Sequence, residues 1–235
     1  RMDIPKDEIP ISIATIPVQT IVEQGSNDLV SALRNASGVS AYLWYGVYEY
    51  YTIRGFNIQD VQLADGMRLQ GNRLNTQINN IESVEILKGP ASVNYGGGAL
   101  AGAINLIRKK PQPTPLYDFN FTAGRFQNYR LGTGLTGALF GSSKLQYRLD
   151  TQFADIEGWR GAGARRFNVT PALVWQPTSR DRITIHQAFN ADRYDGDPGI
   201  PLAALDLPNA PLNRNFRTPS DFQRFRDSLT QVQYN

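Results

Sequence analysis

The second half of the 235-residue chain alternates apolar and polar residues over long stretches, and this period of two constrains the fold most. In YDFNFTAG (117–124), apolar side chains stand at every second position. Residues 144–153 and 182–190 repeat the pattern, and residues 167–175 follow it more loosely. Such alternation predicts extended strands with one apolar and one polar face.

The connections between these strands alternate in length. Residues 140–143 and 177–181 form short turns, whereas residues 156–166 and 194–226 are long and polar. Short turns at one end and long loops at the other are typical of an outer-membrane β-barrel. A soluble antiparallel sandwich has the same alternation, and the asymmetry of the loops favours the barrel over it. In a barrel, we expect the charged residues to lie on the strand face that lines the wet lumen.

The number of strands predicts an open sheet. Five alternating strands, or six with SLTQVQYN (228–235), are too few to close around a second domain, because barrels of about eight strands are already filled by side chains. We therefore expect the second half of the chain to form an incomplete barrel.

The composition narrows the classes of function. The chain has no cysteine and one histidine, His186, which argues against thiolate metal sites and against triad chemistry. The formal net charge of +3 gives no support to a nucleic-acid partner. No stretch reaches the roughly 18 apolar residues of a transmembrane helix. We expect no catalytic centre, no metal site and no nucleic-acid partner.

The first half reads as a small mixed α/β domain. A helix is expected over residues 26–38 with Ser26 as its N-cap, and the Asp65-Gly66 pair predicts a hairpin over residues 61–70. The remaining segments are strands, expected at residues 11–18, 84–87 and 102–109. The proline-rich residues 111–115 mark a boundary, which predicts two domains, 1–113 and 114–235.

Glycines gather in ILKGPASVNYGGGALAGAINL (86–106). Such a run serves to cradle a phosphate, to make a tight turn or to let backbone approach backbone or ligand closely. No Lys-Ser/Thr pair follows the glycines, and they precede a strand and not a long helix, which excludes a P-loop. We therefore expect the structural use for Gly96, Gly97, Gly98 and Gly102.

Three ordered motifs carry a family resemblance. VEILKGPASVNYGGGALAGAINL (84–106), TIRGF (52–56) and LADGMRLQG (63–71) resemble the plug domain of TonB-dependent outer-membrane receptors, and within that family the siderophore receptors of the ferrichrome type. Residues 16–40 fit the first strand and helix of such a plug. The resemblance covers roughly residues 3–113 and continues as the first strands of a barrel.

The resemblance implies a fold, a function and a set of partners. The fold is an α+β plug domain with a small mixed sheet and short helices, followed by antiparallel strands of an incomplete outer-membrane barrel, which has 22 strands in the family. The function is import of ferric siderophores across the bacterial outer membrane by TonB-coupled active transport. The implied partners are TonB with its inner-membrane energy-coupling complex, the iron–siderophore ligand and outer-membrane lipid, with no cofactor.

Other functions remain open beside this one. The receptor could take a ligand other than a siderophore, such as a cobalamin, or it could be a plug-containing signalling receptor. A soluble β-rich enzyme, for instance a glycosidase using Asp150, Asp155 and Glu157, comes last, because such an enzyme needs two carboxylates that face each other across a cleft.

The resemblance also implies roles for single residues. Arg54 and Gln70 match ligand-facing positions of the plug, where a guanidinium and an amide suit a chelate rich in oxygen acceptors. Trp44 and Tyr45, in the aromatic run YLWYGVYEYY (42–51), are expected in the ligand pocket, and about half of the run in the core. Lys88 is expected to lock the plug to barrel glutamates. An internal ion pair for Arg54 and a plain loop position for Gln70 are the alternatives.

Overall fold

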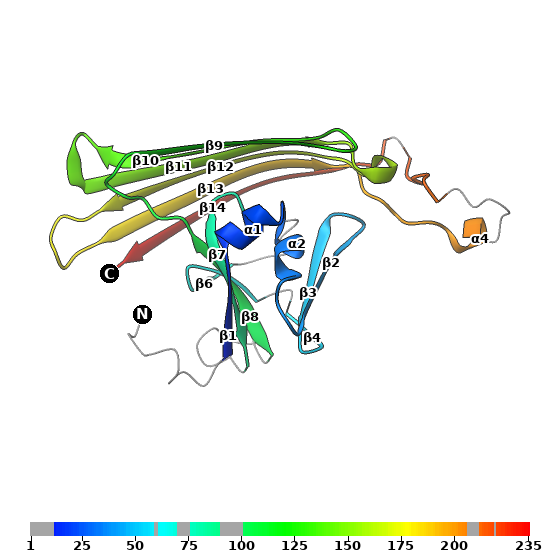
Figure 1. Ribbon diagram of the computed structural model, residues 1–235, viewed down its shortest axis with the longest axis horizontal. Coiled ribbons are helices and arrows are strands. Elements are labelled where there is room, and N and C mark those ends of the chain that lie inside the picture. Colours follow the sequence, from blue (N-terminus) through cyan, green and yellow to red (C-terminus); the bar gives the residue numbers. More distant parts are fainter. Residues whose placement is uncertain (1–11, 59–60, 70–75, 90–100, 206–211, 219) are drawn as a thin grey trace. The chain divides into compact units, whose positions relative to one another are not determined.

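The computed structural model describes residues 12–58, 61–69, 76–89, 101–205, 212–218 and 220–235, which Figure 1 shows as coloured ribbon. The chain divides into two units, Arg1–Lys109 and Lys110–Asn235. The division falls a few residues before the domain boundary that the sequence predicts at residue 113. Within the described residues, no helix is both long and apolar enough to cross a bilayer.

The first unit is built on a five-stranded mixed sheet with the strand order β1-β7-β8-β5-β6. Strand β5 runs parallel to β8, and the other neighbours are antiparallel. The strands span Ser12–Pro17 (β1), Gln62–Ala64 (β5), Met67–Arg68 (β6), Ile81–Lys88 (β7) and Gly102–Arg108 (β8). The predicted hairpin around Asp65-Gly66 is confirmed, because it joins β5 to β6.

Two short helices, α1 (Val18–Glu23) and α2 (Leu29–Leu33), follow β1. A helix does form inside the expected range 26–38, but it spans only Leu29–Leu33, and Ser26 is not its cap. Asp28 is the N-cap of α2, because its carboxylate accepts the backbone N–H of Ser31 at 2.7 Å. The Ser31 hydroxyl is in turn placed at the Asp28 N–H, which completes a capping box.

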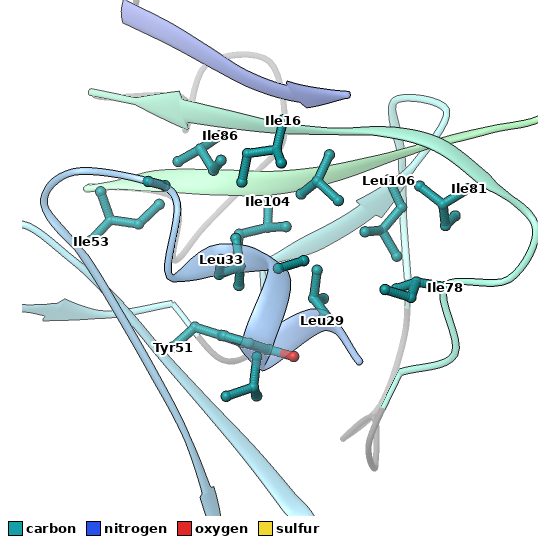
Figure 2. Packing of buried hydrophobic residues seen from close by; sticks show 14 of the residues in the cluster. Ile16, Leu29, Leu33, Tyr51, Ile53, Ile78, Ile81, Ile86, Ile104 and Leu106 are labelled. Atoms are coloured by element: carbon teal, nitrogen blue, oxygen red, sulfur yellow. The ribbon is translucent and has the colours of Figure 1, made fainter. Parts of the chain in front are cut away.

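The hydrophobic core of the first unit lies between the sheet and helix α2, as Figure 2 shows. Leu29 and Leu33 of α2 meet Ile86 of β7 and Ile104 of β8, and all four side chains are at most 1% exposed. Burial of one such side chain contributes about 1.5–3 kcal/mol. Sequence segments far apart in the chain are therefore held together by this one cluster.

A separate three-stranded sheet completes the first unit. It consists of β2 (Val39–Trp44), β3 (Tyr48–Ile53) and β4 (Phe56–Asn57) in that order. The aromatic run 42–51 lies in these two strands, and the reversal between β2 and β3 was not predicted from it. Tyr51 and Ile53 of β3 are fully buried and join the core of the main sheet.

The turn between β5 and β6 is fixed by side chains of β8. Asp65 accepts the Arg108 Nε–H at 2.6 Å and the Arg108 backbone N–H at 3.0 Å. The Gly66 N–H donates to Asn105 Oδ1 at 2.9 Å. Asp65 has a φ of +49°, which Asp tolerates better than most residues, so these bonds stabilise a turn that the Asp-Gly pair already favours.

The second unit is an open antiparallel sheet of six strands in sequence order, β14-β13-β12-β11-β10-β9. The strands span Leu116–Gly124 (β9), Asn128–Leu139 (β10), Ser142–Ile156 (β11), Ala164–Trp175 (β12), Ile183–Tyr194 (β13) and Gln223–Tyr234 (β14). A short helix, α4 (Leu202–Leu205), lies in the connection from β13 to β14. The strands predicted from the period of two, and the open sheet, are confirmed.

The two faces of this sheet differ as the alternation predicts. One face carries exposed apolar side chains in register, for example Phe121, Leu131, Phe153 and Phe167 on four successive strands. The other face is polar, with buried Arg148, Asp150, Arg166, Asn168, His186 and Asp192. An exposed apolar band beside a buried polar face is the reverse of a water-soluble sheet and is typical of a transmembrane barrel wall.

Candidate functional site

The tip of the β2–β3 hairpin carries stacked aromatic rings. Trp44 and Tyr45 stack with ring centroids 5.1 Å apart and an interplanar angle of 13°. Tyr50 meets Tyr42 in a second stack at 5.3 Å and Trp44 edge-on at 5.5 Å. We call Tyr42, Trp44, Tyr45 and Tyr50 the aromatic cluster. Strand alternation explains it, because Tyr42, Trp44 and Tyr50 fall on one face of the hairpin.

The aromatic cluster lies on the surface of the first unit. Tyr42, Trp44 and Tyr45 are 52%, 51% and 43% exposed. The expectation that about half of the six aromatic residues form core is wrong, since Tyr51 alone among them is fully buried. Flat rings with a polar edge on an exposed tip can contact a ligand that has both apolar and polar surface.

The opposite face of the hairpin rests on a buried carboxylate. Glu49 is 1% exposed, and it accepts the Thr76 backbone N–H at 2.5 Å and the Thr76 hydroxyl at 2.7 Å. Burial, together with the charge of nearby Glu49, raises the pKa of Tyr51 well above its usual value. Tyr51 therefore keeps its proton throughout the physiological range. The two hydrogen bonds from Thr76 to Glu49 hold strand β3, which carries Tyr50 of the aromatic cluster.

Arg54 occupies the turn between β3 and β4. Its φ is +53°, and its backbone N–H donates to the Gly38 carbonyl oxygen at 2.9 Å. The side chain is exposed. Gly55, the next residue, has a φ of +83°, so two successive left-handed residues present the guanidinium at the turn.

The structure brings Trp44 and Tyr45 together and keeps Arg54 apart from them. Trp44 pairs with Tyr48 at one end of β3, whereas Arg54 follows the other end of the strand. Six steps of about 3.3 Å along the strand separate the backbones of Tyr48 and Arg54 by roughly 20 Å. Gln70, the other predicted ligand contact, lies outside the described residues, as do Gly96, Gly97 and Gly98.

Lys88 ends strand β7 and pairs in register with Ser12 and Gly102. Its Nζ donates to the Ser37 hydroxyl at 3.3 Å. Within the part of the first unit that the structure describes, this serine is its hydrogen-bonding partner. The ion pair with a glutamate that the sequence analysis expects stays a prediction.

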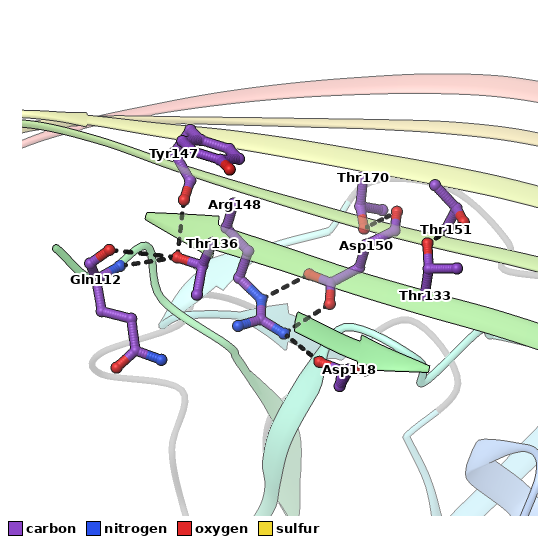
Figure 3. A network of polar contacts seen from close by, with 9 residues as sticks. All are labelled: Gln112, Asp118, Thr133, Thr136, Tyr147, Arg148, Asp150, Thr151 and Thr170. Carbon is purple, nitrogen blue, oxygen red and sulfur yellow. Dashed lines mark hydrogen bonds and ion pairs between the residues drawn. The ribbon is translucent and has the colours of Figure 1, made fainter. Parts of the chain in front are cut away.

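Figure 3 shows a charged network on the polar face of the six-stranded sheet. Arg148 and Asp150 are two residues apart on β11, and the guanidinium donates to both carboxylate oxygens at 2.7 Å. Both side chains are 4% exposed. Asp118 of β9 lies 3.6 Å from the same guanidinium. A bidentate pair is the strongest hydrogen-bonded arrangement of a guanidinium and a carboxylate, and it holds both side chains in one orientation on the polar face.

Two glycines of β10 make room for this network. Gly134 stands in register between Asp118 and Asp150, and a Cβ there would lie 2.2 Å from Asp118 Oδ2. A Cβ at Gly132 would lie 2.6 Å from Asn120 Oδ1. The glycines therefore let the side chains of β9 lie across β10, which brings Asp118 to Arg148 on the strand beyond.

The expectation that charges lie on one strand face is only partly correct. Arg165, Arg193 and Arg224 share one register row on the apolar face, at the end of the sheet where the connections 157–163 and 195–222 begin. Asp155, also in that row, pairs with Arg165 at 3.1 Å. The alternation itself predicts this placement, because each of these charged residues occupies, at the end of its strand, a position that belongs to the apolar face.

The carboxylates named for a glycosidase do not face each other. Asp150 is bound by Arg148 on the polar face, and Asp155, five residues along the same strand, points to the opposite face. Among the described residues, no group of three or more His, Asp or Glu side chains stands where it could hold a metal ion. Asp150 and Asp155 therefore do not form the facing pair of carboxylates that a glycosidase needs.

Comparison with known proteins decides the family. Residues 5–103 match the family described as TonB-dependent Receptor Plug Domain. The chain belongs to the TonB-dependent receptor family. The predicted fold class, an α+β plug followed by antiparallel barrel strands, and the predicted outer-membrane location are confirmed with it.

Relatives of this TonB-dependent receptor include the ferrichrome outer membrane transporter/phage receptor of Escherichia coli K12, 27% identical over 94% of this chain and 31% of that protein. The metal-pseudopaline receptor of Pseudomonas aeruginosa is 31% identical over 94% of the chain and 32% of its own length. The ferrioxamine B receptor of Salmonella typhimurium is 25% identical over the whole chain and 36% of that protein.

Solved structures share the fold of this receptor. The ferric-catecholate import receptor of E. coli K12 aligns over 98% of this chain and 36% of its own, with a TM-score of 0.86 at 21% identity. The chain thus spans about a third of the length of the relatives that it matches.

Proposed function

We propose that this TonB-dependent receptor imports ferric siderophores across the outer membrane, with energy supplied through TonB and its inner-membrane complex. The observation that carries the proposal is the presence of a plug domain and a membrane-type β-sheet in one chain. The names of the ferrichrome and ferrioxamine B receptors support the class of ligand. No catalytic step and no cofactor enter the proposal.

The proposal gives Arg54 and the aromatic cluster different roles. Ferric siderophores present many oxygen acceptors, to which the exposed guanidinium of Arg54 can donate hydrogen bonds. We therefore assign Arg54 to equilibrium binding of the ligand, with Gln70 as a second contact. Trp44 and Tyr45 lie at the other end of β3 from Arg54, roughly 20 Å away along the strand backbone. We assign them to contact with the ligand after its capture, and Lys88 to holding the plug in the barrel.

Binding of ferrichrome and of ferrioxamine B to the full-length receptor, by isothermal titration calorimetry, tests this division. Arg54→Gln is expected to weaken binding of the recognised chelate about tenfold, as the loss of a charge-assisted hydrogen bond would. Trp44→Ala combined with Tyr45→Ala is expected to leave Kd within a factor of about two and to slow uptake into cells.

Arg34→Gln is the matched control, because Arg34 is an exposed arginine of the same unit at the C-cap of α2. It should change neither quantity. Loss of equilibrium binding in the Trp44/Tyr45 variant, with Arg54→Gln behaving like the control, would contradict the assignment.

A second candidate ligand is a metal complex of pseudopaline. The receptor named for that complex is 31% identical to this chain, a higher identity than that of the ferrichrome or ferrioxamine B receptor. The same calorimetric experiment with a metal–pseudopaline complex separates the two candidates.

A further inference from the structure

A small polar patch interrupts the apolar face of the six-stranded sheet. On β13 and β14, which lie side by side in Figure 1, Gln187 pairs in register with Thr230, and Phe189 pairs with Ser228 in the next row. These residues alternate along their strands with the residues of the polar face, so their side chains point to the apolar side. We call Gln187, Ser228 and Thr230 the amide–hydroxyl patch.

The amide–hydroxyl patch lies near the middle of the apolar face. Gln187 is four residues from Ile183, which shares a register row with Trp175 and Tyr234 at the short-turn end. It is six residues from Arg193 in the charged row at the other end. At about 3.3 Å per residue and a strand tilt of about 40°, these steps give roughly 10 Å and 15 Å of depth. The patch therefore lies in the hydrocarbon part of the bilayer, which has no water to complete hydrogen bonds.

The hydrogen bonds inside the patch leave donors and acceptors over. Gln187 Nε2 donates to Ser228 Oγ at 2.7 Å, and the Thr230 hydroxyl donates to Gln187 Oε1. Within the described strands, the Ser228 hydroxyl proton has no acceptor, and Gln187 Oε1 and Thr230 Oγ1 keep unused lone pairs. Ser228 and Thr230 are exposed. Because lipid tails cannot bond to these groups, the patch gains from contact with a polar partner.

The backbone pairing is interrupted beside the same patch. The register of β12 with β13 stops after Val169 and resumes at Ala172, so Thr170 and Pro171 are left out of it. Proline lacks the N–H that a central strand donates to its neighbour. A gap in the ladder and a group of polar side chains thus meet near the middle of the membrane-facing wall. Such a place is better covered by protein than by lipid.

An apolar groove of about 310 Å³ lies between the patch and the short-turn end. It is lined by Leu145, Leu173, Trp175, Ile183 and Ile185. Beside it on β14, Val232 is 60% exposed and pairs in register with Ile185 of the groove. Tyr234 is 69% exposed and stands in the next row. One strand along a row, about 4.8 Å, changes the depth by only about 3 Å at such a tilt, so the projecting side chains and the groove lie at similar depths.

We propose that the face formed by β12, β13 and β14 is the contact surface of a symmetric receptor dimer in the outer membrane. Two copies in one bilayer have the same orientation, so their two-fold axis is parallel to the membrane normal and each level meets its counterpart at the same depth. With the axis near β13, β14 of one copy faces β12 of the other. Val232 and Tyr234 of each copy then lie against the groove of the other.

The chemistry of the patch also favours a second copy as the partner. Amide and hydroxyl groups both donate and accept hydrogen bonds, so two amide–hydroxyl patches that meet at the axis satisfy each other. A patch made of like charges could not pair with itself in this way. The proposal rests on the outer-membrane location and not on the identity of the transported ligand.

Resonance energy transfer between labelled copies of the full-length receptor in phosphatidylethanolamine–phosphatidylglycerol vesicles tests the proposal. Transfer is expected to rise with the receptor-to-lipid ratio. Gln187→Leu combined with Thr230→Val is expected to weaken association about tenfold, as the loss of hydrogen bonds between membrane segments would. Val232→Ala, expected to weaken it about threefold through lost packing, provides the test if the double variant does not fold.

Thr133→Val combined with Thr151→Val is the matched control. The two hydroxyl oxygens are 2.8 Å apart on β10 and β11, on the same apolar face and in the same register row as Ser228. This variant should leave association unchanged. Equal loss in the two double variants, or a receptor that stays monomeric at every receptor-to-lipid ratio, would overturn the proposal.

Thiol cross-linking in cells separates a second copy from any other partner. The chain has no cysteine, and Phe189→Cys places one near the proposed axis, whereas Leu135→Cys places one on β10 of the same face. In a full-length receptor free of other cysteines, we expect a covalent dimer from Phe189→Cys and none from Leu135→Cys. A cross-link from Phe189→Cys to a different protein, with no receptor dimer, would refute the dimer. Siderophore uptake by the same cells reports separately on the proposed transport function.

Discussion

Gly102→Ala is expected to unfold the β7–β8 region of the plug. A Cβ at position 102 would lie 2.0 Å from the Leu87 carbonyl oxygen and 3.1 Å from Ile53 Cδ1. The φ of Gly102 is +147°, which L-residues rarely adopt. The clash with backbone cannot be relieved by a rotamer change, because Gly102 pairs directly with Lys88 in the ladder. We expect a loss of about 3 kcal/mol or more in local stability.

Hydrogen exchange of the full-length receptor measures this effect at peptides that cover residues 81–108. The control is Gly25→Ala, because Gly25 also has a positive φ, +60°, but has open space around its Cα. That substitution should cost about 1 kcal/mol and leave exchange in β7 and β8 unchanged. Equal protection of β7 and β8 in the two variants would contradict the close-approach role of Gly102.

Asp150→Asn is expected to be the most destabilising single change in the six-stranded sheet. It would leave the Arg148 guanidinium, 4% exposed, without its bidentate partner. Breaking a buried pair in this way costs about 3–5 kcal/mol. Asp118, 3.6 Å away and 40% exposed, restores only part of the lost interaction. The temperature at which the folded barrel converts to the unfolded form in an electrophoretic heating series reports the change.

Two comparisons make this result specific to the buried pair. Asp155→Asn removes the carboxylate of the exposed Asp155–Arg165 pair and should cost less than about 1 kcal/mol. Replacing both members of the buried pair, Arg148→Met with Asp150→Leu, should be milder than Asp150→Asn, because no uncompensated charge stays buried. Similar unfolding temperatures for Asp150→Asn and Asp155→Asn would show that the network does not stabilise the sheet.

The barrel strands could be predicted from the sequence because the alternation that marks them is read from neighbouring residues alone. A period of two survives in any strand with one apolar and one polar face, so β9 and β11–β13 are visible in residues 117–190. The charged row of Arg165, Arg193 and Arg224 on the apolar face was not predicted, because alternation alone does not tell the hydrocarbon part of a strand from its headgroup end. The register of neighbouring strands places Arg165, Arg193 and Arg224 in one row.

The plug was harder to predict from single motifs. The Asp65-Gly66 turn is a strong local signal, and it forms the hairpin. The reversal at Tyr45 and Gly46 has no such signal, because Tyr45 adopts a φ of +53° that aromatic residues seldom take. Trp44, Tyr45 and Arg54 are all expected at the ligand site from the sequence, whereas β3 separates Trp44 and Tyr45 from Arg54. The structural use of Gly102 was predicted correctly, and its close approach to Leu87 needed the sheet register.

Uptake of radiolabelled iron by cells that make the full-length receptor tests the proposed transport most directly. Iron would be supplied as ferrichrome, as ferrioxamine B or as a metal–pseudopaline complex, in cells with and without TonB. We predict TonB-dependent accumulation of iron from ferrichrome, from ferrioxamine B or from both. Accumulation from neither siderophore would contradict siderophore import, and equal accumulation without TonB would contradict energy coupling through the plug.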